Sequence, residues 1–236
     1  MSTRGSRGAT VVVFARLPMP GQVKTRMTPP LSAEEAALLY GCMLDDVLEL
    51  TARSSRELGF EAVLAVHPPE AIGELAARAP APFRVIGQRG RDLGARLAFA
   101  VDEACAAGRS PILVRGSDSP ALEAAMLREA LGALEKEDVV VCPDLDGGYN
   151  LIGMRQPVPG IFSHTMSAST TLEELCLRAT RRGLRVHRLP TRFDLDTVED
   201  LGHLGRLRAA GDTPPCPRTL ACCDENGLWP LAKLPP

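Results

Sequence analysis

The stretch Val11-Val-Val-Phe-Ala-Arg-Leu-Pro-Met-Pro-Gly-Gln-Val-Lys-Thr-Arg26 decides the fold prediction, because a short apolar run gives way at once to a polar loop. Residues 11–15 are continuously apolar, which is typical of a strand that is covered on both faces. Pro18, Pro20 and Gly21 then indicate a loop rather than a helix. The sequence therefore predicts a buried strand that ends in a basic loop.

Strand and helix patterns alternate along the rest of the chain. Ser32 and Glu35 have the spacing of a capping box, which predicts a helix from residue 32 to about residue 53. Further strands are expected at 62–66, 83–86, 111–114, 139–142 and 149–154, with an extended segment at 185–189. Further helices are expected at 72–78, 93–107, 120–134, 172–182 and 197–209. This alternation predicts a three-layer α/β sandwich with a mostly parallel sheet.

The composition is that of an ordinary globular chain. The chain has 236 residues, of which 45% are hydrophobic and 24% charged, and its formal net charge is −2. A near-neutral chain has no overall electrostatic reason to bind nucleic acid, and no apolar run reaches the roughly 18 residues of a membrane span. The apolar run 11–15 is too short for a signal-peptide core, so we expect a soluble, cytoplasmic protein.

The chain is expected to form one domain, residues 10–211, followed by an irregular Pro- and Cys-containing extension, residues 212–236. Within that extension, Cys216, Cys222 and Cys223 have no second Cys or His pair at the spacing of a zinc site. The other four cysteines are isolated in apolar or helical stretches, as is typical of buried thiols in a reducing compartment.

The basic loop after the first strand has the chemistry of a phosphate site. Gly21 allows the backbone to approach a ligand closely, and Arg16, Lys24 and Arg26 supply cationic donors for phosphate oxygens. The loop is not a P-loop, because Val23 precedes Lys24 where that motif has Gly. It is either a phosphate-binding loop or a solvated basic loop.

Acidic clusters follow or precede other predicted elements. Asp118 lies in Gly116-Ser-Asp-Ser-Pro120, where it is either a ligand for a hard cation or, with Ser119, a cap of the following helix. Asp146 lies in an Asp-Gly-Gly segment that suits a hairpin turn. Asp196 precedes the last predicted helix, where it or Thr197 suits a cap. Taken together with the basic loop, these carboxylates suit a divalent cation that bridges phosphate groups.

These segments together resemble the bacterial family DUF2064. The resemblance covers about residues 10–210, and the motifs are specific as an ordered set. They are residues 12–26, Gln88 with Asp92-Leu-Gly-x-Arg96, residues 116–120, Asp146-Gly-Gly-Tyr149-x-Leu-x-Gly153, and Asp194-Leu-Asp-Thr197-x-Glu-Asp200. Members are often labelled glycosyltransferases of the A-type (GT-A) fold, which nucleotide-diphospho-sugar transferases share. The resemblance implies a nucleotide-binding domain with a divalent metal, Mg²⁺ or Mn²⁺.

The set is also similar, more distantly, to guanylyltransferases that act on phospholactate or phosphoenolpyruvate. That similarity implies that Asp118 and Asp196 are the metal ligands. It also implies that Asp146, Gly147, Gly148 and Tyr149 lie on the acceptor side. The chain departs from the family at Met166, where a Trp is expected before Ser167-Ala-Ser-Thr170, a segment expected to shape the acceptor pocket.

The nucleotide is expected to lie against a set of residues spread over the first half of the chain. Gln88, Gly94 and Arg96 are expected near its base or ribose, although Arg96 equally suits the solvated face of a helix. The whole predicted set is Ala15, Arg16, Gly21, Lys24, Gln88, Gly94 and Arg96.

The function expected from these features is a Mg²⁺-dependent transferase that binds a nucleotide and an unknown small acceptor, and binds neither nucleic acid nor membrane. Lys24, Arg26 and Asp118 are the expected catalytic residues. The Lys-Thr-Arg loop favours nucleotidyl transfer, since a triphosphate requires more positive charge than a diphosphate. The family label favours glycosyl transfer from a nucleotide sugar. A non-catalytic nucleotide-binding protein is the third reading.

Overall fold

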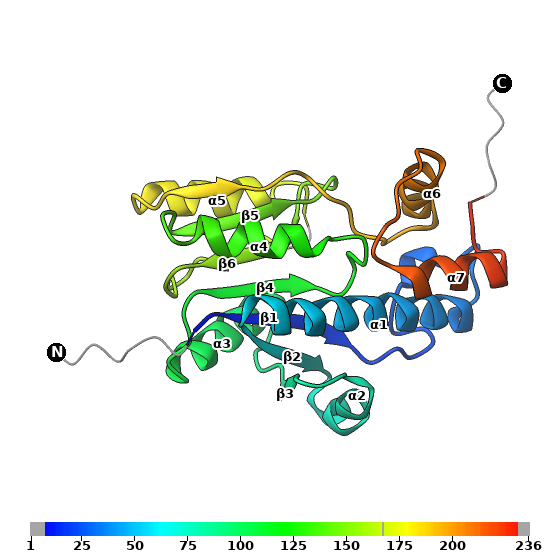
Figure 1. Cartoon of the computed structure of the whole chain (residues 1–236), viewed down its shortest axis with the longest axis horizontal. Coiled ribbons are helices and arrows are strands. Elements are labelled where there is room, and N and C mark those ends of the chain that lie inside the picture. The colour runs from blue at the N-terminus through cyan, green and yellow to red at the C-terminus, as the bar shows by residue number, and fades with distance from the viewer. Residues whose placement is uncertain (1–7, 167, 231–236) are drawn as a thin grey trace.

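The computed structural model describes residues 8–166 and 168–230, and its centre is a seven-stranded sheet in the order β3-β2-β1-β4-β6-β5-β7 (Figure 1). Among the described strands, β6 alone runs antiparallel to its neighbours β4 and β5, and the other pairings are parallel. The mostly parallel sheet is therefore confirmed. The strands are β1 Thr10–Arg16, β2 Glu61–His67, β3 Arg84–Gly87, β4 Ile112–Gly116, β5 Val139–Pro143, β6 Tyr149–Met154 and β7 Val186–Arg188.

Helices cover both faces of the sheet and complete the three layers. Helices α1 and α4 pack on one face, and α3 and α5 pack on the other (Figure 1). Helix α2 packs near α1 beside β2, while α6 and α7 lie beyond the strands. The helices are α1 Ala33–Leu58, α2 Ile72–Arg78, α3 Leu93–Ala106, α4 Ala124–Ala133, α5 Thr171–Arg181, α6 Leu201–Ala209 and α7 Pro217–Asn226.

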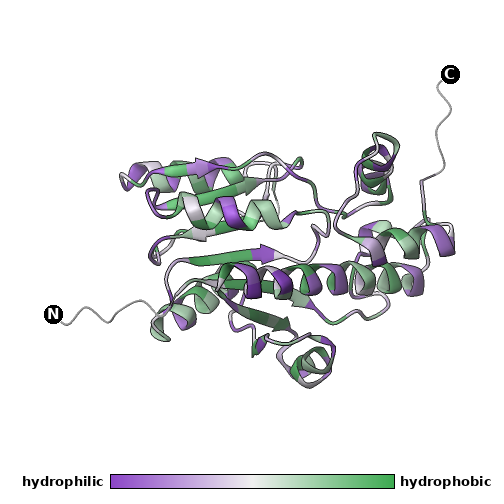
Figure 2. Ribbon diagram, in the orientation of Figure 1, coloured by the Kyte–Doolittle hydropathy of each residue, from purple (hydrophilic) through white to green (hydrophobic). Residues whose placement is uncertain are grey.

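The continuous apolar run in β1 reflects burial on both faces. Val11 and Val13 pack toward α1, whereas Val12 packs in the core on the α3 side. All three are at most 1% exposed, and each such side chain stabilises the fold by roughly 1.5–3 kcal/mol. Figure 2 shows the same division, with mostly hydrophobic strands and with polar residues along α1.

Helix α1 begins where the capping box predicts. The Ser32 Oγ accepts a hydrogen bond from the Glu35 amide at 3.1 Å, and Glu35 Oε2 accepts from the Ser32 amide at 2.7 Å. The helix ends later than expected, at Leu58, because Gly59 adopts a left-handed conformation with φ 74° and closes the last turn.

Two other boundaries differ from the sequence prediction. Helix α4 begins at Ala124 rather than at Pro120, since residues 117–123 turn toward the site described below. The segment expected to be irregular contains helix α7, with Pro217 in its first turn. Cys216, Cys222 and Cys223 are buried there against α1, and residues 231–236 lie outside the described part of the chain.

Helix α7 is fixed to α1 through a buried carboxylate. Asp46 is 2% exposed, and it accepts hydrogen bonds from the amides of Arg218 and Thr219 and from the Thr219 hydroxyl. The first amides of a helix have no acceptor within that helix, and in α7 two of them donate to Asp46 of α1 instead. Within the described ranges, no helix combines the length and apolarity that crossing a membrane requires.

The topology gathers the polar segments at one edge of the sheet. The loop after β1, the segment after β4 and the β5–β6 turn all leave the carboxyl ends of parallel strands. Ligands in open α/β sheets bind along this edge.

Candidate functional site

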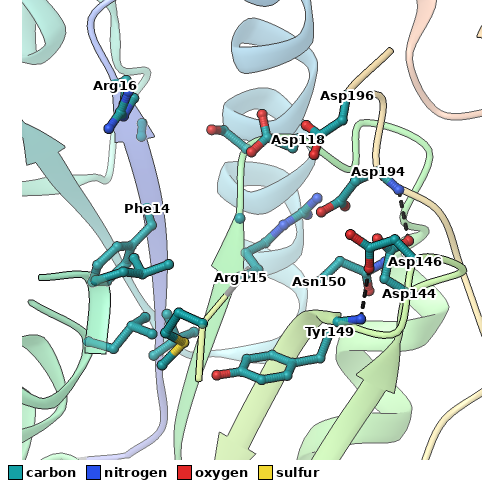
Figure 3. Close-up of a pocket in the computed structure, with 18 of the residues that line it drawn as sticks. Phe14, Arg16, Arg115, Asp118, Asp144, Asp146, Tyr149, Asn150, Asp194 and Asp196 are labelled. Atoms are coloured by element: carbon teal, nitrogen blue, oxygen red, sulfur yellow. Dashed lines mark hydrogen bonds between the residues drawn. The ribbon is translucent and has the colours of Figure 1, made fainter. Parts of the chain in front are cut away.

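A cavity of about 540 Å³ opens at the carboxyl edge of the sheet, and most of the predicted site residues line it (Figure 3). Its volume falls within the roughly 300–1,000 Å³ of small-molecule sites. The predicted residues in its lining are Ala15, Arg16, Lys24, Arg26, Gln88, Arg96, Asp118, Asp146, Gly148, Tyr149 and Asp196.

Three predicted glycines do not line the cavity, and each has a backbone role instead. Gly21 adopts φ 73° in the basic loop, and Gly147 adopts φ 90° in the β5–β6 turn. At Gly94 a Cβ atom would lie 2.7 Å from the Phe162 carbonyl oxygen, so only glycine permits this approach of α3 to the neighbouring loop.

Lys24 lies at the centre of the site, between two acidic side chains. Its ammonium group forms an ion pair with Asp118 Oδ1 and a second one, at 2.9 Å, with Asp196 Oδ1. Arg26 reaches the other oxygen of Asp196 at 3.3 Å. The Lys24 side chain is 5% exposed, whereas that of Arg26 is 67% exposed. The basic loop therefore contacts both acidic segments directly.

Local conformation directs Lys24 inward. Its backbone adopts φ 47°, a left-handed conformation that non-glycine residues seldom take and that indicates a strained position. The Tyr40 ring lies beside the ammonium group, with 5.8 Å between Nζ and the ring centroid. The Tyr40 hydroxyl is held by Ser117 at 2.8 Å and by the Arg16 amide at 2.9 Å.

The charges of this centre stabilise one another. Burial alone lowers the pKa of Lys24, but the carboxylates of Asp118 and Asp196 outweigh that effect and raise it. Burial raises the pKa of Asp196, yet the charge of Lys24 and its hydrogen bond lower it overall. Lys24 is therefore a permanent cation and Asp196 an ionised carboxylate near neutral pH.

The structure does not use Asp118, Ser119 or Asp196 as helix caps, the alternative roles that the sequence allowed for them. Helix α4 begins at Ala124 with Glu123 before it, so neither Asp118 nor Ser119 caps it. The Ser119 hydroxyl donates to Asp194 instead. Asp196 is not the cap, but Thr197 is, as the alternative prediction had it: Thr197 precedes the helical turn Val198–Asp200, and its amide and hydroxyl donate hydrogen bonds to Asp200.

The acid pair fits a divalent cation that is bound together with a substrate. Asp118 and Asp196 converge on one cationic atom, the Nζ of Lys24, so their oxygens already surround a single positive centre. In the described part of the chain, no three His, Cys, Asp or Glu side chains are grouped for a metal. Mg²⁺ commonly takes one or two protein carboxylates and completes its shell with water and substrate phosphates.

The side of the cavity near β1 and β2 carries the residues predicted for the base or ribose. The Gln88 side-chain amide donates to the Ala65 and Ala15 carbonyls at 2.9 and 3.3 Å, which fixes its orientation. Arg96 lies on α3, where its Nη1 is 3.4 Å from the His67 ring nitrogen. Arg96 is thus a cavity residue rather than part of a solvated helix face.

The opposite side is formed by the hairpin between β5 and β6. The Asp144 amide donates to the Gly148 carbonyl, and Asp146 Oδ1 accepts from the Gly148 amide at 2.7 Å. The hairpin-turn reading is therefore correct, and the turn still presents Asp146, Gly148 and Tyr149 to the cavity. Met166 and Ala168 also line it, whereas Ser167 lies outside the described residues.

The sequence analysis gave no role to several polar residues of the cavity, among them Arg115, Asn150 and Asp144, and it named Asp194 only within a motif. Arg115 and Asn150 are 1% and 3% exposed, and Asp194 accepts a hydrogen bond from Ser119. Figure 3 shows Arg115 extending from β4 toward Asp194. The signal in the sequence was a charged residue, Arg115, directly after the predicted apolar strand 111–114.

Comparison with known proteins agrees with this fold and with the family resemblance. The family described as "Uncharacterized protein conserved in bacteria (DUF2064)" matches residues 50–169. The 2-phospho-L-lactate guanylyltransferase of Methanothermobacter thermautotrophicus is 30% identical over 185 residues, which cover 77% of this chain and 78% of that protein. The phosphoenolpyruvate guanylyltransferase of Sphaerobacter thermophilus is 30% identical over 207 residues, covering 86% and 92%.

A solved structure has a fold similar to that of this chain. It comes from Desulfovibrio desulfuricans G20 and is named for the nucleotide-diphospho-sugar transferases. It matches this chain with a TM-score of 0.84 and 28% identity, over 94% of this chain and 96% of that one. The predicted GT-A-like fold is therefore confirmed, as is the resemblance to the guanylyltransferases.

Proposed function

The chain belongs to the family DUF2064 and is a transferase, and from this premise we propose that it moves a nucleotidyl group from a nucleoside triphosphate to a small acceptor with the help of Mg²⁺. In the proposed reaction, an acceptor oxygen forms a bond to the α-phosphorus. The bond from that phosphorus to the bridging oxygen of the β-phosphate breaks, and pyrophosphate leaves.

The observation that supports this proposal most is the position of Lys24. Its buried ammonium lies between Asp118 and Asp196, and Arg26 lies beside them. A triphosphate that enters the cavity meets two cationic side chains at the place where the acid pair converges. Lys24 and Arg26 neutralise its charge, and preorganised charge of this kind is the largest single contribution in many enzymes.

Asp118 and Asp196 would hold the metal together with phosphate oxygens. Mg²⁺ bound there supplies Lewis acidity at the phosphoryl group and a template for both substrates. In this proposal, Gln88 and Arg96, which line the cavity, bind and orient the nucleoside. The hairpin with Asp146 and Tyr149 lines the cavity as well and binds the acceptor.

Two relatives support nucleotidyl transfer, because both are named guanylyltransferases and each is covered over more than two thirds of its length. Glycosyl transfer remains the second candidate on one specific observation. The solved structure with the TM-score of 0.84 is named for enzymes that use nucleotide-diphospho-sugars.

The leaving group distinguishes the two reactions. The protein is incubated with Mg²⁺, phosphoenolpyruvate or 2-phospholactate and each of the four ribonucleoside triphosphates, and separately with nucleotide sugars. Nucleotidyl transfer predicts pyrophosphate, which an Asp118→Asn variant fails to release. Release of a nucleoside diphosphate from a nucleotide sugar, with no pyrophosphate from any triphosphate, would favour glycosyl transfer instead.

A further inference from the structure

Three basic side chains meet where β1 and β2 end. Arg16 and His67 are partners in the parallel register of these two strands. Val12 and Ala65, earlier in the same strands, pack in the core on the α3 side. Because side chains alternate along a strand, Arg16 and His67 point to that side as well. Arg96 reaches them from α3, and its Nη1 lies 3.4 Å from the His67 Nε2.

This basic cluster of Arg16, His67 and Arg96 lies where two cavities adjoin. Arg16 and Arg96 line the 540 Å³ cavity of the proposed site. A second cavity of about 320 Å³ shares Arg16 and Gln22 with the first, and His67 lines it too. Figure 3 shows Arg16 at the end of its strand, apart from Asp118. The space for a ligand therefore continues from the acid pair to the basic cluster.

The two arginines of the cluster form no ion pair in the described part of the chain. The Arg16 Nη1 donates to the Gln22 carbonyl at 3.3 Å, and Arg96 contacts the His67 ring. The Arg96 Nε and the His67 Nδ1 are buried without a hydrogen-bond partner among residues 8–166 and 168–230. Lys24, in contrast, lies between two carboxylates. The protein therefore neutralises the charge of Lys24 but not that of the basic cluster.

The members of the cluster also repel one another. Burial lowers the pKa values of Arg96 and His67, and neighbouring positive charges lower them further: Arg16 acts on both, and Arg96 acts on His67. Glu70 opposes the shift of His67 and Asp92 that of Arg96, but an amide of α3 already donates to the Asp92 carboxylate at 2.8 Å. Holding like charges together costs free energy, and a bound anion would offset that cost.

We propose that Arg16 and Arg96 bind the terminal phosphate of the triphosphate, that His67 positions Arg96, and that this contact selects triphosphates over nucleotide sugars. The inference rests on the proposed function, because it assigns a contact to the donor of the same reaction. Guanidinium groups bind phosphate oxygens through paired N–H donors. A guanidinium can only donate, so the His67 Nε2 is the acceptor that holds Arg96. Arg96 would then orient the nucleoside through the attached phosphates.

The distribution of charge favours the terminal phosphate at this place. Lys24 is already paired with Asp118 and Asp196, and these carboxylates repel a phosphate unless a metal ion covers them. Arg16 and Arg96 supply two positive charges without a carboxylate partner. A nucleotide sugar has an uncharged sugar in place of the terminal phosphate, and it would leave both guanidinium groups without an anion.

Ligands that differ in the terminal group test the inference by calorimetric titration. Each of the four ribonucleoside triphosphates, the matching diphosphate and a nucleotide sugar of the same base are titrated into the full chain with Mg²⁺. We expect the best triphosphate to bind at least about tenfold more tightly than its diphosphate and its nucleotide sugar, the factor expected of charged hydrogen bonds. Inorganic pyrophosphate is titrated alone, and tighter binding of it than of any triphosphate would assign the cluster to free anions and overturn the inference.

Variants show whether the two arginines cause that difference. Arg16→Met and Arg96→Met should each bring the affinities for triphosphate and diphosphate to within about threefold of each other. An arginine that contacts only the base or ribose weakens both ligands equally and leaves their ratio unchanged. Arg53→Met, which removes an exposed arginine of α1, is the matched control and should keep the preference of the wild type. Because Arg16 is exposed, its replacement tests the inference even if Arg96→Met folds poorly.

The positioning role of His67 has its own pair of variants. His67→Phe removes the acceptor for Arg96 and should lower the ratio of triphosphate to diphosphate affinity by at least about threefold. His67→Gln keeps an acceptor and should restore the ratio to within about twofold of the wild type. An equal loss in both variants would show that His67 acts through packing alone.

Equal affinity of the wild type for triphosphate and diphosphate, equal affinity for triphosphate and nucleotide sugar, or a preference that survives both arginine replacements would each contradict the inference. Pyrophosphate release in the presence of an acceptor tests the proposed function separately. Release without a preference for triphosphate overturns the terminal-phosphate contact alone. A preference without release from any acceptor supports that contact and counts against nucleotidyl transfer.

Discussion

At the scale of single residues, the proposed function depends on the position of one ammonium group, that of Lys24. Lys24 is separated by 172 positions from Asp196, yet their side chains are 2.9 Å apart. No local pattern in the sequence predicts such a contact. The sequence did predict that a basic loop and acidic clusters line the cavity, but it did not predict that Lys24 lies between the carboxylates of Asp118 and Asp196.

Replacing Lys24 by Met removes the buried cation and keeps most of the side chain. We expect kcat/KM for the triphosphate to fall by about 10²–10³, the loss typical of one preorganised electrostatic contact. Steady-state pyrophosphate release measures this. Arg26→Met is the matched control, because Arg26 is 67% exposed, and its loss should be less than about tenfold. Comparable activity of Lys24→Met and the wild type would exclude Lys24 from phosphate binding.

Asp144 predicts a specific pH dependence of stability. Burial, together with the hydrogen bond and charge of Asp146, raises its pKa from 3.8 to about 7. The folded protein therefore holds this proton more tightly than the unfolded chain does. The contribution of Asp144 to stability is full below about pH 4 and is lost as the pH rises to about 7.

Chemical denaturation between pH 4 and pH 8 measures that contribution as a difference between variants. The free energy of unfolding of the wild type should fall, relative to that of Asp144→Asn, as the pH rises through this window. Asp102→Asn, at an exposed position on α3, serves as the control and should run parallel to the wild type. Parallel curves for Asp144→Asn and wild type would refute the assignment.

At the scale of elements, the sequence predicted most strands and the start of α1, because these depend on local patterns. The sequence predicted β1 and β5 from their apolar runs and the start of α1 from the capping box of Ser32. Helix α7 was missed because its apolar face consists of cysteines and its N-terminus is capped by Asp46, a residue of a different helix. Helix α7 is therefore stabilised mainly by its packing against α1, and such packing cannot be predicted from a short window of sequence.

The Asp46 contact predicts that α7 depends on α1 for its stability. Asp46→Ala leaves the buried Thr219 amide and hydroxyl without acceptors, which should cost about 1–3 kcal/mol. Hydrogen exchange of α7 should then accelerate more than that of the central strands. Asp45→Ala is the matched control, since this half-exposed neighbour only pairs with Arg78 and should cost about 1 kcal/mol or less. Equal exchange in both variants would show that Asp46 does not anchor the helix.

At the scale of the whole molecule, the sheet order assembles the cavity. Because β1 and β4 are neighbours and parallel, the basic loop after β1 and Asp118 after β4 emerge side by side. The hairpin of β5 and β6 closes the other side, and its Leu151 pairs with Arg115 of β4. The alternation of elements predicted the sandwich, but strand order was not predicted, and Arg115, one residue beyond the predicted strand 111–114, was given no role.

In the proposed function, this cavity binds a metal-complexed nucleotide through Lys24, Asp118 and Asp196. The most direct measurement is a calorimetric titration of each ribonucleoside triphosphate into wild type and Asp196→Asn, with Mg²⁺ and with a chelator. We expect the wild type to bind at least one triphosphate, and we expect this binding to weaken by about tenfold or more both in the chelator and in the variant. Triphosphate binding of equal strength in all conditions, or none in any, would contradict it.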